Sequence, residues 1–88
     1  MENKSIKIIS LMDGRLLISQ IEEVTSELGE PDCKISYPYV INVKENNTLT
    51  PFLNDVTGQS TFMISSDKIL TLADPKPTML ELYQSLTK

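Results

Sequence analysis

Apolar and polar residues alternate along most of this chain, and short polar clusters separate the alternating runs. A period of two is typical of β-strands that bury one face, because successive side chains point to opposite faces of a sheet. Asp13-Gly14 between the first two runs predicts a tight hairpin, since glycine tolerates a positive φ. The predicted strands lie at residues 6–12, 15–24, 35–43, 49–53, 59–65 and 69–72.

Two prolines fall inside these runs. Pro38 lies in the third run and Pro51 in the fourth. Because proline donates no backbone hydrogen bond, each marks an edge position or a break in a strand. About five short strands joined by tight turns predict a small barrel or rolled sheet.

The pattern changes after the Asp74-Pro75-Lys76-Pro77 segment, where apolar residues follow helical spacing. Thr78 with Glu81 three residues later fits a capping box, which predicts that the helix is capped by Thr78 and covers residues 78–87. A helix of about ten residues is not stable alone in water, so it must pack on an apolar surface. Its expected buried residues are Met79, Leu82, Tyr83 and Leu86.

The 88 residues are enough for a single domain, with the barrel over about 6–73 and the helix after it. The net charge of −4 excludes a basic field over the whole surface, so any nucleic-acid contact must be local. The single cysteine, Cys33, cannot form an intramolecular disulfide, which favours a reducing compartment. The first residues do not have the pattern of a signal peptide, and no run has the length of a membrane span, so we expect a cytoplasmic protein without a membrane partner.

Residues for catalysis are missing from the sequence. There is no histidine for a catalytic triad and no cysteine pair for zinc, and Gly14, Gly29 and Gly58 do not form a phosphate-binding loop. We therefore expect a protein that is not an enzyme and that holds no metal and no cofactor.

Three groups of residues each allow two interpretations. The acidic side chains in and before the loop at 25–32 could bind a divalent cation or form a solvated loop. Cys33 could be a reactive thiol or a small buried residue, which is the more common case. Tyr37 and Tyr39 could stack on bases, although packing in a core or an interface is more typical. The acidic residues are Glu22, Glu23, Glu27, Glu30 and Asp32.

Two blocks of the sequence resemble the Sm-like (LSm) family. Residues 9–17 resemble that family's opening strand, turn and strand, with Gly14-Arg15 in the turn. Residues 62–72 resemble its second motif, in which a short turn joins two apolar strands. The resemblance covers residues 6–72, and the whole chain looks closest to short Sm-like proteins of marine cyanophages. It implies a five-stranded, strongly bent antiparallel (SH3-like) barrel, here with a C-terminal helix, and a host-cell cytoplasmic location if the chain is phage-encoded.

The chain also departs from the Sm-like pattern. Ser65-Ser66 stands in place of the family's Arg-Gly turn, and Ser19 matches a glycine at the bend of the second strand. The segment nearest to the family's uridine pocket is residues 30–34, which has no aromatic residue for stacking and has Lys34 in place of an asparagine. Since stacking contributes about 1–3 kcal/mol per base, these changes remove most of the base-reading chemistry.

The resemblance further implies a cyclic homo-oligomer in which edge strands of neighbouring subunits pair. The expected interface residues are Phe62, Ile64, Ile69 and Leu70. The alternative is a monomer whose edges are protected by Pro51 and the helix.

Around the central opening of such a ring, Lys34 and Lys68, with Ser66, would form a local positive collar for single-stranded RNA. The alternative interpretation is two ordinary surface lysines. The sequence thus predicts a ring that binds single-stranded RNA or an RNA-associated partner, or else a phage protein-interaction or assembly ring without a nucleic-acid role.

Overall fold

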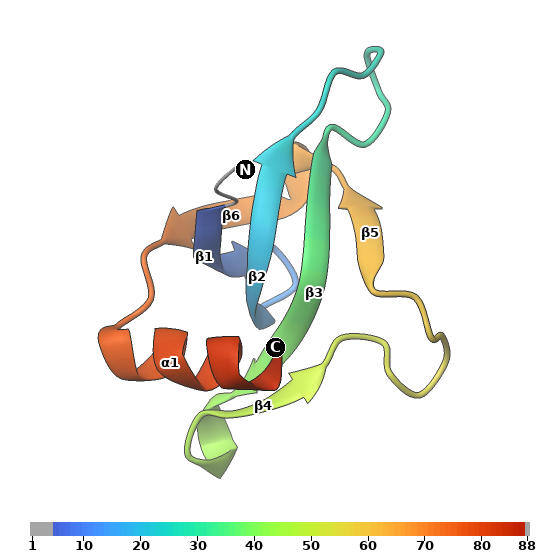
Figure 1. Cartoon of the computed structure of the whole chain (residues 1–88). Coiled ribbons are helices and arrows are strands. Elements are labelled where there is room, and N and C mark those ends of the chain that lie inside the picture. Colours follow the sequence, from blue (N-terminus) through green and yellow to red (C-terminus); the bar gives the residue numbers. More distant parts are fainter. Residues whose placement is uncertain (1–4, 88) are drawn as a thin grey trace.

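The computed structural model describes residues 5–87 and consists of one six-stranded antiparallel sheet and a helix (Figure 1). The fold is therefore mainly β with a C-terminal helix, and the bent sheet is consistent with a small barrel. The elements are β1 (Ser5–Leu11), β2 (Leu16–Glu23), β3 (Cys33–Asn42), the 3-10 turn η1 (Val43–Glu45), β4 (Thr48–Pro51), β5 (Thr61–Ile64), the 3-10 turn η2 (Ser66–Lys68), β6 (Ile69–Ala73) and α1 (Pro77–Leu86).

The strand order is β4-β3-β2-β1-β6, and β5 also pairs with β3. The six strands correspond to the six alternating runs of the sequence, one more than the five-stranded barrel that the Sm-like resemblance implies. The strand β3 is long and changes its partner along its length. Its first half, Cys33–Ser36, pairs with β5, and its second half, Tyr39–Asn42, pairs with β4.

The change of partner occurs at Tyr37 and Pro38. Tyr37 has a φ of 55°, in the left-handed region that a bulky residue rarely adopts, and Pro38 is buried. The pairing between β2 and β3 also shifts register here, between Ile18 and Gln20. Pro38 therefore lies at a break in the ladder, as its missing N–H group predicts, although β3 itself is an interior strand.

The sheet has apolar residues on both faces, and they form two cores. Ile9, Leu11, Leu17 and Ile35 are buried inside the bend, where the phenylalanines of β5 and of the segment after β4 pack against them. Ile18, Ile41 and Tyr83 form a second core between the outer face and α1 (Figure 1). Adjacent residues of one strand, such as Leu17 and Ile18, thus pack into different cores, because successive side chains of a strand point to opposite faces of the sheet.

Tyr83 connects the helix to the middle of the sheet. Its side chain is fully buried, and its hydroxyl accepts a hydrogen bond from the Gln20 N–H group (3.2 Å) and donates to the Tyr37 carbonyl (2.9 Å). The neighbouring Ser36 carbonyl accepts a bond from the Ser19 hydroxyl (3.0 Å). Polar side chains therefore pair with the backbone groups at the shift between β2 and β3, where an unpaired buried group would be costly.

The helix begins one residue earlier than the sequence predicted. Lys76 is its N-cap residue, no side chain caps it, and Pro77 occupies the first turn. The prediction that Thr78 caps the helix was wrong, because proline's fixed φ and missing N–H group suit the first helical position.

The buried face of the helix also differs in part from the prediction. Tyr83 is buried and Met79 is partly buried, as expected. Leu82 and Leu86, however, remain 40% and 45% exposed, and Leu80 is partly buried instead. The sheet therefore covers a narrower strip of the helix than its apolar spacing indicates. No helix within residues 5–87 has the length and apolar character needed to span a bilayer.

Replacing Tyr83 with phenylalanine should lower the free energy of unfolding by about 1–3 kcal/mol, because the Gln20 and Tyr37 backbone groups lose their partner inside the protein. Tyr39→Phe is the matched control. The Tyr39 hydroxyl makes only a long, exposed bond to the Leu86 carbonyl (3.4 Å), so its loss should cost less. Urea unfolding measures both variants, and equal losses would contradict the role given to the Tyr83 hydroxyl.

Burial raises the pKa of Tyr83 to about 12, from an ordinary value of 10.0. Between these values the folded state holds the proton more tightly than the unfolded state, so this contribution to stability is complete below about pH 10 and is lost as the pH rises toward 12. Over that range it amounts to roughly 2–3 kcal/mol. Urea unfolding at about pH 9 and about pH 11 should show a larger decline for the wild type than for Tyr83→Phe. Parallel declines would contradict the assignment.

Candidate assembly edges and nucleic-acid site

Lys34, the first residue predicted to contact RNA, lies on β3 between β2 and β5. Its cross-strand neighbours are Glu22 on β2 and Met63 on β5. The Lys34 Nζ atom lies 3.8 Å from the Glu22 Oε2 atom, and both side chains are more than a third exposed. The charge of Lys34 is thus balanced by a carboxylate of its own chain.

Ser66, the second predicted residue, is the first residue of η2. Its backbone N–H and its hydroxyl both donate to the Asp32 carboxylate, at 2.7 and 2.8 Å. These hydrogen bonds lower the pKa of Asp32 below its usual value. Ser66 therefore ties the loop between β2 and β3 to the connection between β5 and β6.

Lys68, the third predicted residue, ends η2. Its carbonyl accepts a bond from the Met12 N–H group (2.9 Å), and it lines a groove of about 520 Å³ beside the turn between β1 and β2. Among the described residues no carboxylate lies within 4 Å of its ammonium group. Lys34 does not line this groove, so a collar of both residues would require several subunits.

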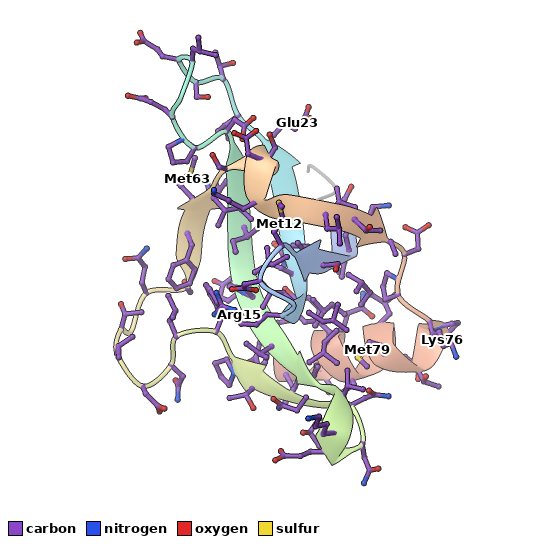
Figure 2. The ribbon with its side chains drawn as sticks, turned by 180° about the vertical axis from the view of Figure 1, so that it is seen from behind. Met12, Arg15, Glu23, Met63, Lys76 and Met79 are labelled. Atoms are coloured by element: carbon purple, nitrogen blue, oxygen red, sulfur yellow. The ribbon has the colours of Figure 1, made fainter. Side chains whose placement is uncertain are left out.

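The sheet leaves strand edges unpaired at both ends. Within residues 5–87, β6 pairs only with β1, whereas β4 and β5 each pair only with β3. Leu70 and Leu72 on β6 are 68% and 48% exposed, and Met63 on β5 is 47% exposed. Figure 2 shows Met63 on the outer side of β5. The free edges of β5 and β6 therefore carry apolar side chains that their own subunit does not cover.

Of the four predicted interface residues, only Leu70 is strongly exposed. Phe62, Ile64 and Ile69 are partly buried against the inner core. Sequence reasoning did not select Leu72 and Met63, although strand alternation places Met63 opposite the core-facing Phe62 and Ile64. Leu72 pairs with Ile9 beyond a register shift in the β1–β6 ladder, which changes the alternation of β6.

A second groove, of about 650 Å³, runs beside β6. Its apolar lining comes from Ile21, Cys33, Ile69, Leu70 and Leu72, and its polar lining includes Lys7, Glu22 and Glu23. Cys33 is buried in the chain. Burial, together with the nearby Asp32 and Glu23 carboxylates, raises the pKa of the Cys33 thiol, which favours the protonated form. The geometry thus matches a small packing residue rather than an activated thiol.

The remaining candidate residues are dispersed. In the described part of the chain, no three His, Cys, Asp or Glu side chains gather closely enough to hold a metal ion. Tyr39 packs edge-to-face against Tyr83, with ring centroids 5.8 Å apart, and so serves the outer core. Tyr37 is 48% exposed and lines a smaller cavity between β3 and the loop that follows β4.

These features define a small, mainly β protein with a bent antiparallel sheet, free apolar edges and a helix on its outer face. A family model described as "Family of unknown function (DUF6561)" matches residues 4–88. Because the match covers nearly the whole chain, the protein belongs to this family. A comparison with curated proteins finds no match.

Proposed function

We propose that this protein is an Sm-like subunit that assembles into a cyclic homo-oligomer through the free edges of β5 and β6. The observation that carries this proposal is the unpaired edge of β6, whose Leu70 and Leu72 side chains are exposed. An edge that presents unpaired backbone groups beside apolar side chains is a template for pairing with another chain, and natural monomers usually protect it with charges, prolines or a covering element.

The position of the helix supports this proposal. The Tyr83 hydroxyl of α1 forms hydrogen bonds with the backbone of β2 and β3, and the Tyr39 hydroxyl of β3 donates to a carbonyl of α1. The helix therefore covers the outer face of the central strands and leaves β5 and β6 open. A domain of this size has a thin core, so burying the edge leucines in a neighbour would add stability that one subunit lacks.

The order of the strands supports the Sm-like part of the proposal. The last strand, β6, returns to pair with the first strand, while β5 pairs at the opposite end of the sheet. The free edges of β5 and β6 are thus joined by the short turn η2 but belong to different parts of the sheet. One subunit can therefore offer β5 to one neighbour and β6 to the next, which is the arrangement that closes a ring.

Single-stranded RNA, or an RNA-associated partner, is the ligand proposed for this ring. Lys68 carries this part of the proposal because no acidic group within residues 5–87 pairs with it. Lys34 contributes less, since Glu22 balances its charge. Repetition around a ring would multiply the Lys68 charges, and phosphate contacts of this kind bind without reading sequence.

A ring that binds a protein partner or serves in phage assembly, without RNA, is the second candidate. Two observations favour it. The net charge is −4, and Glu22 balances the charge of Lys34, one of the two predicted phosphate contacts. The two candidates share the same assembly and differ only in the ligand.

Assembly should depend on the β6 edge. Leu70→Asp combined with Leu72→Asp should convert a single multi-subunit species into monomers, because two charges would enter the apolar contact. Light scattering at micromolar concentration measures the mass of each species. Val43→Asp is the matched control, since Val43 is 58% exposed and lies in η1, away from both edges. A wild-type protein that stays monomeric, or an edge variant that assembles normally, would contradict the proposal.

RNA binding by the ring should be weak, poorly sequence-specific and strongly reduced by added salt. Lys68→Ala should weaken binding of all sequences about equally and reduce the salt dependence, and Lys34→Ala should have a smaller effect. Fluorescence anisotropy with uridine-rich and mixed-sequence oligonucleotides tests both variants. Tight, uridine-selective binding would show that the site lies elsewhere, and no binding at low salt would favour the protein-interaction ring.

A further inference from the structure

The tip of the loop between β2 and β3 carries an exposed apolar residue between two acidic residues. Leu28 is fully exposed, and Glu27 and Glu30 flank it in the same turn. Figure 1 shows this connection extending beyond the ends of β2 and β3, and Figure 2 shows its side chains pointing away from the sheet. An isolated exposed leucine is ordinary, but one at the tip of a projecting acidic loop combines two features that a complementary surface could recognise.

The loop holds this tip in a defined conformation. The Glu30 N–H group donates to the Glu27 carbonyl (3.0 Å), and Gly29 has a φ of 88°, which together form a tight turn that places Leu28 at its corner. The Val24 N–H group donates to the Asp32 carbonyl (3.0 Å), closing the loop at its base. The bonds from Ser66 to the Asp32 carboxylate then fix that base to η2. Less entropy is therefore lost when the tip is buried in a partner.

A groove of complementary character lies beside the turn between β1 and β2. It is the groove of about 520 Å³ that Lys68 lines, and its apolar lining is Leu11, Met12, Phe52 and Ile64. Met12 is 63% exposed, so apolar surface is open to the solvent there. Figure 2 shows Met12 and Arg15 close to this turn.

Two cations flank the groove. Arg15 lies over the Phe52 ring, 5.4 Å from its centroid, and is partly balanced by Asp13, whose Oδ2 atom is 2.8 Å from the guanidinium group. Lys68 has no such partner among the described residues. The groove thus combines an apolar floor with a net positive rim. The charge of this rim is opposite to the charge of the loop tip.

We infer that the tip of the β2–β3 loop in one copy of this chain docks into the Met12–Lys68 groove of a second copy. Leu28 would be buried against Met12, Phe52 and Ile64, and Glu27 and Glu30 would face Lys68 and Arg15. Charge complementarity between two surfaces of the same chain identifies the second copy as the occupant, since each copy carries both halves. Leu28 is fully exposed, so the tip does not fill the groove of its own chain.

This contact joins two different surfaces and does not involve Leu70 or Leu72, so it is separate from the proposed pairing of strand edges. It would link subunits or rings to one another, and it stands whether or not the ring proposal holds. The test therefore uses the full chain carrying Leu70→Asp and Leu72→Asp, in which pairing through β6 is disabled.

Two further variants of this parent protein separate the halves of the contact. The loop variant adds Leu28→Asp, and the groove variant adds Met12→Glu and Lys68→Glu. All three altered side chains are exposed, so folding should be preserved, which circular dichroism and urea unfolding would verify. Sedimentation velocity at concentrations well above the micromolar range, where the parent is expected to be monomeric, should show that the parent associates as its concentration rises, and that each variant associates roughly tenfold to a hundredfold more weakly.

An equimolar mixture of the two variants gives the decisive result. The loop variant keeps an intact groove and the groove variant keeps an intact loop, so the mixture should form a one-to-one complex that neither variant forms alone. Val56→Asp, at a 78% exposed position in the loop after β4, should associate like the parent. A parent that stays monomeric, variants that associate as the parent does, or a mixture that stays monomeric would each overturn the inference.

Discussion

The hydroxyl of Tyr83 is the interaction on which the rest of this structure depends. The sheet bends where β3 exchanges β5 for β4, and there Tyr37 takes a left-handed conformation and the pairing with β2 shifts register. The ladder cannot satisfy every backbone group at such a point. Tyr83 arrives from the last element of the chain and pairs with Gln20 and Tyr37, so the bend and the docking of the helix stabilise each other.

This arrangement determines which parts of the surface remain open. The helix covers the outer face of the central strands, and the inner core fills the concave face. The apolar side chains that remain uncovered therefore include those at the strand edges and near the turns, such as Leu70, Leu72 and Met12. The polar residues of the candidate site also fall into two groups, paired and unpaired. Lys34 and Ser66 contact carboxylates of their own chain, whereas Lys68 has no acidic partner in the described residues. Assembly is thus better supported by the geometry than RNA recognition.

The strands could be predicted from the sequence because their alternation is strong, and β1 and β2 begin and end within one residue of the predicted bounds. The helix start could have been predicted from Pro77 instead of the capping box, since proline favours the first helical turn.

The exposure of Leu82 and Leu86 could not be predicted, because it depends on how far the sheet extends beneath the helix. The ion pair of Lys34 likewise depends on the register of β2 against β3, which the sequence does not specify. The residues of the candidate site were therefore chosen from the sequence without knowledge of their partners, and their roles stay predictions.

Amide hydrogen exchange of the edge strands, measured below and above the concentration at which the protein assembles, tests the central claim most directly. If β5 and β6 pair with neighbouring subunits, amides in Thr61–Ile64 and Ile69–Ala73 should exchange more slowly in the assembled protein, while those of the interior strand β2 should change little. An assembled protein whose β5 and β6 amides exchange as fast as in the dilute protein would contradict the claim that these edges form the interface.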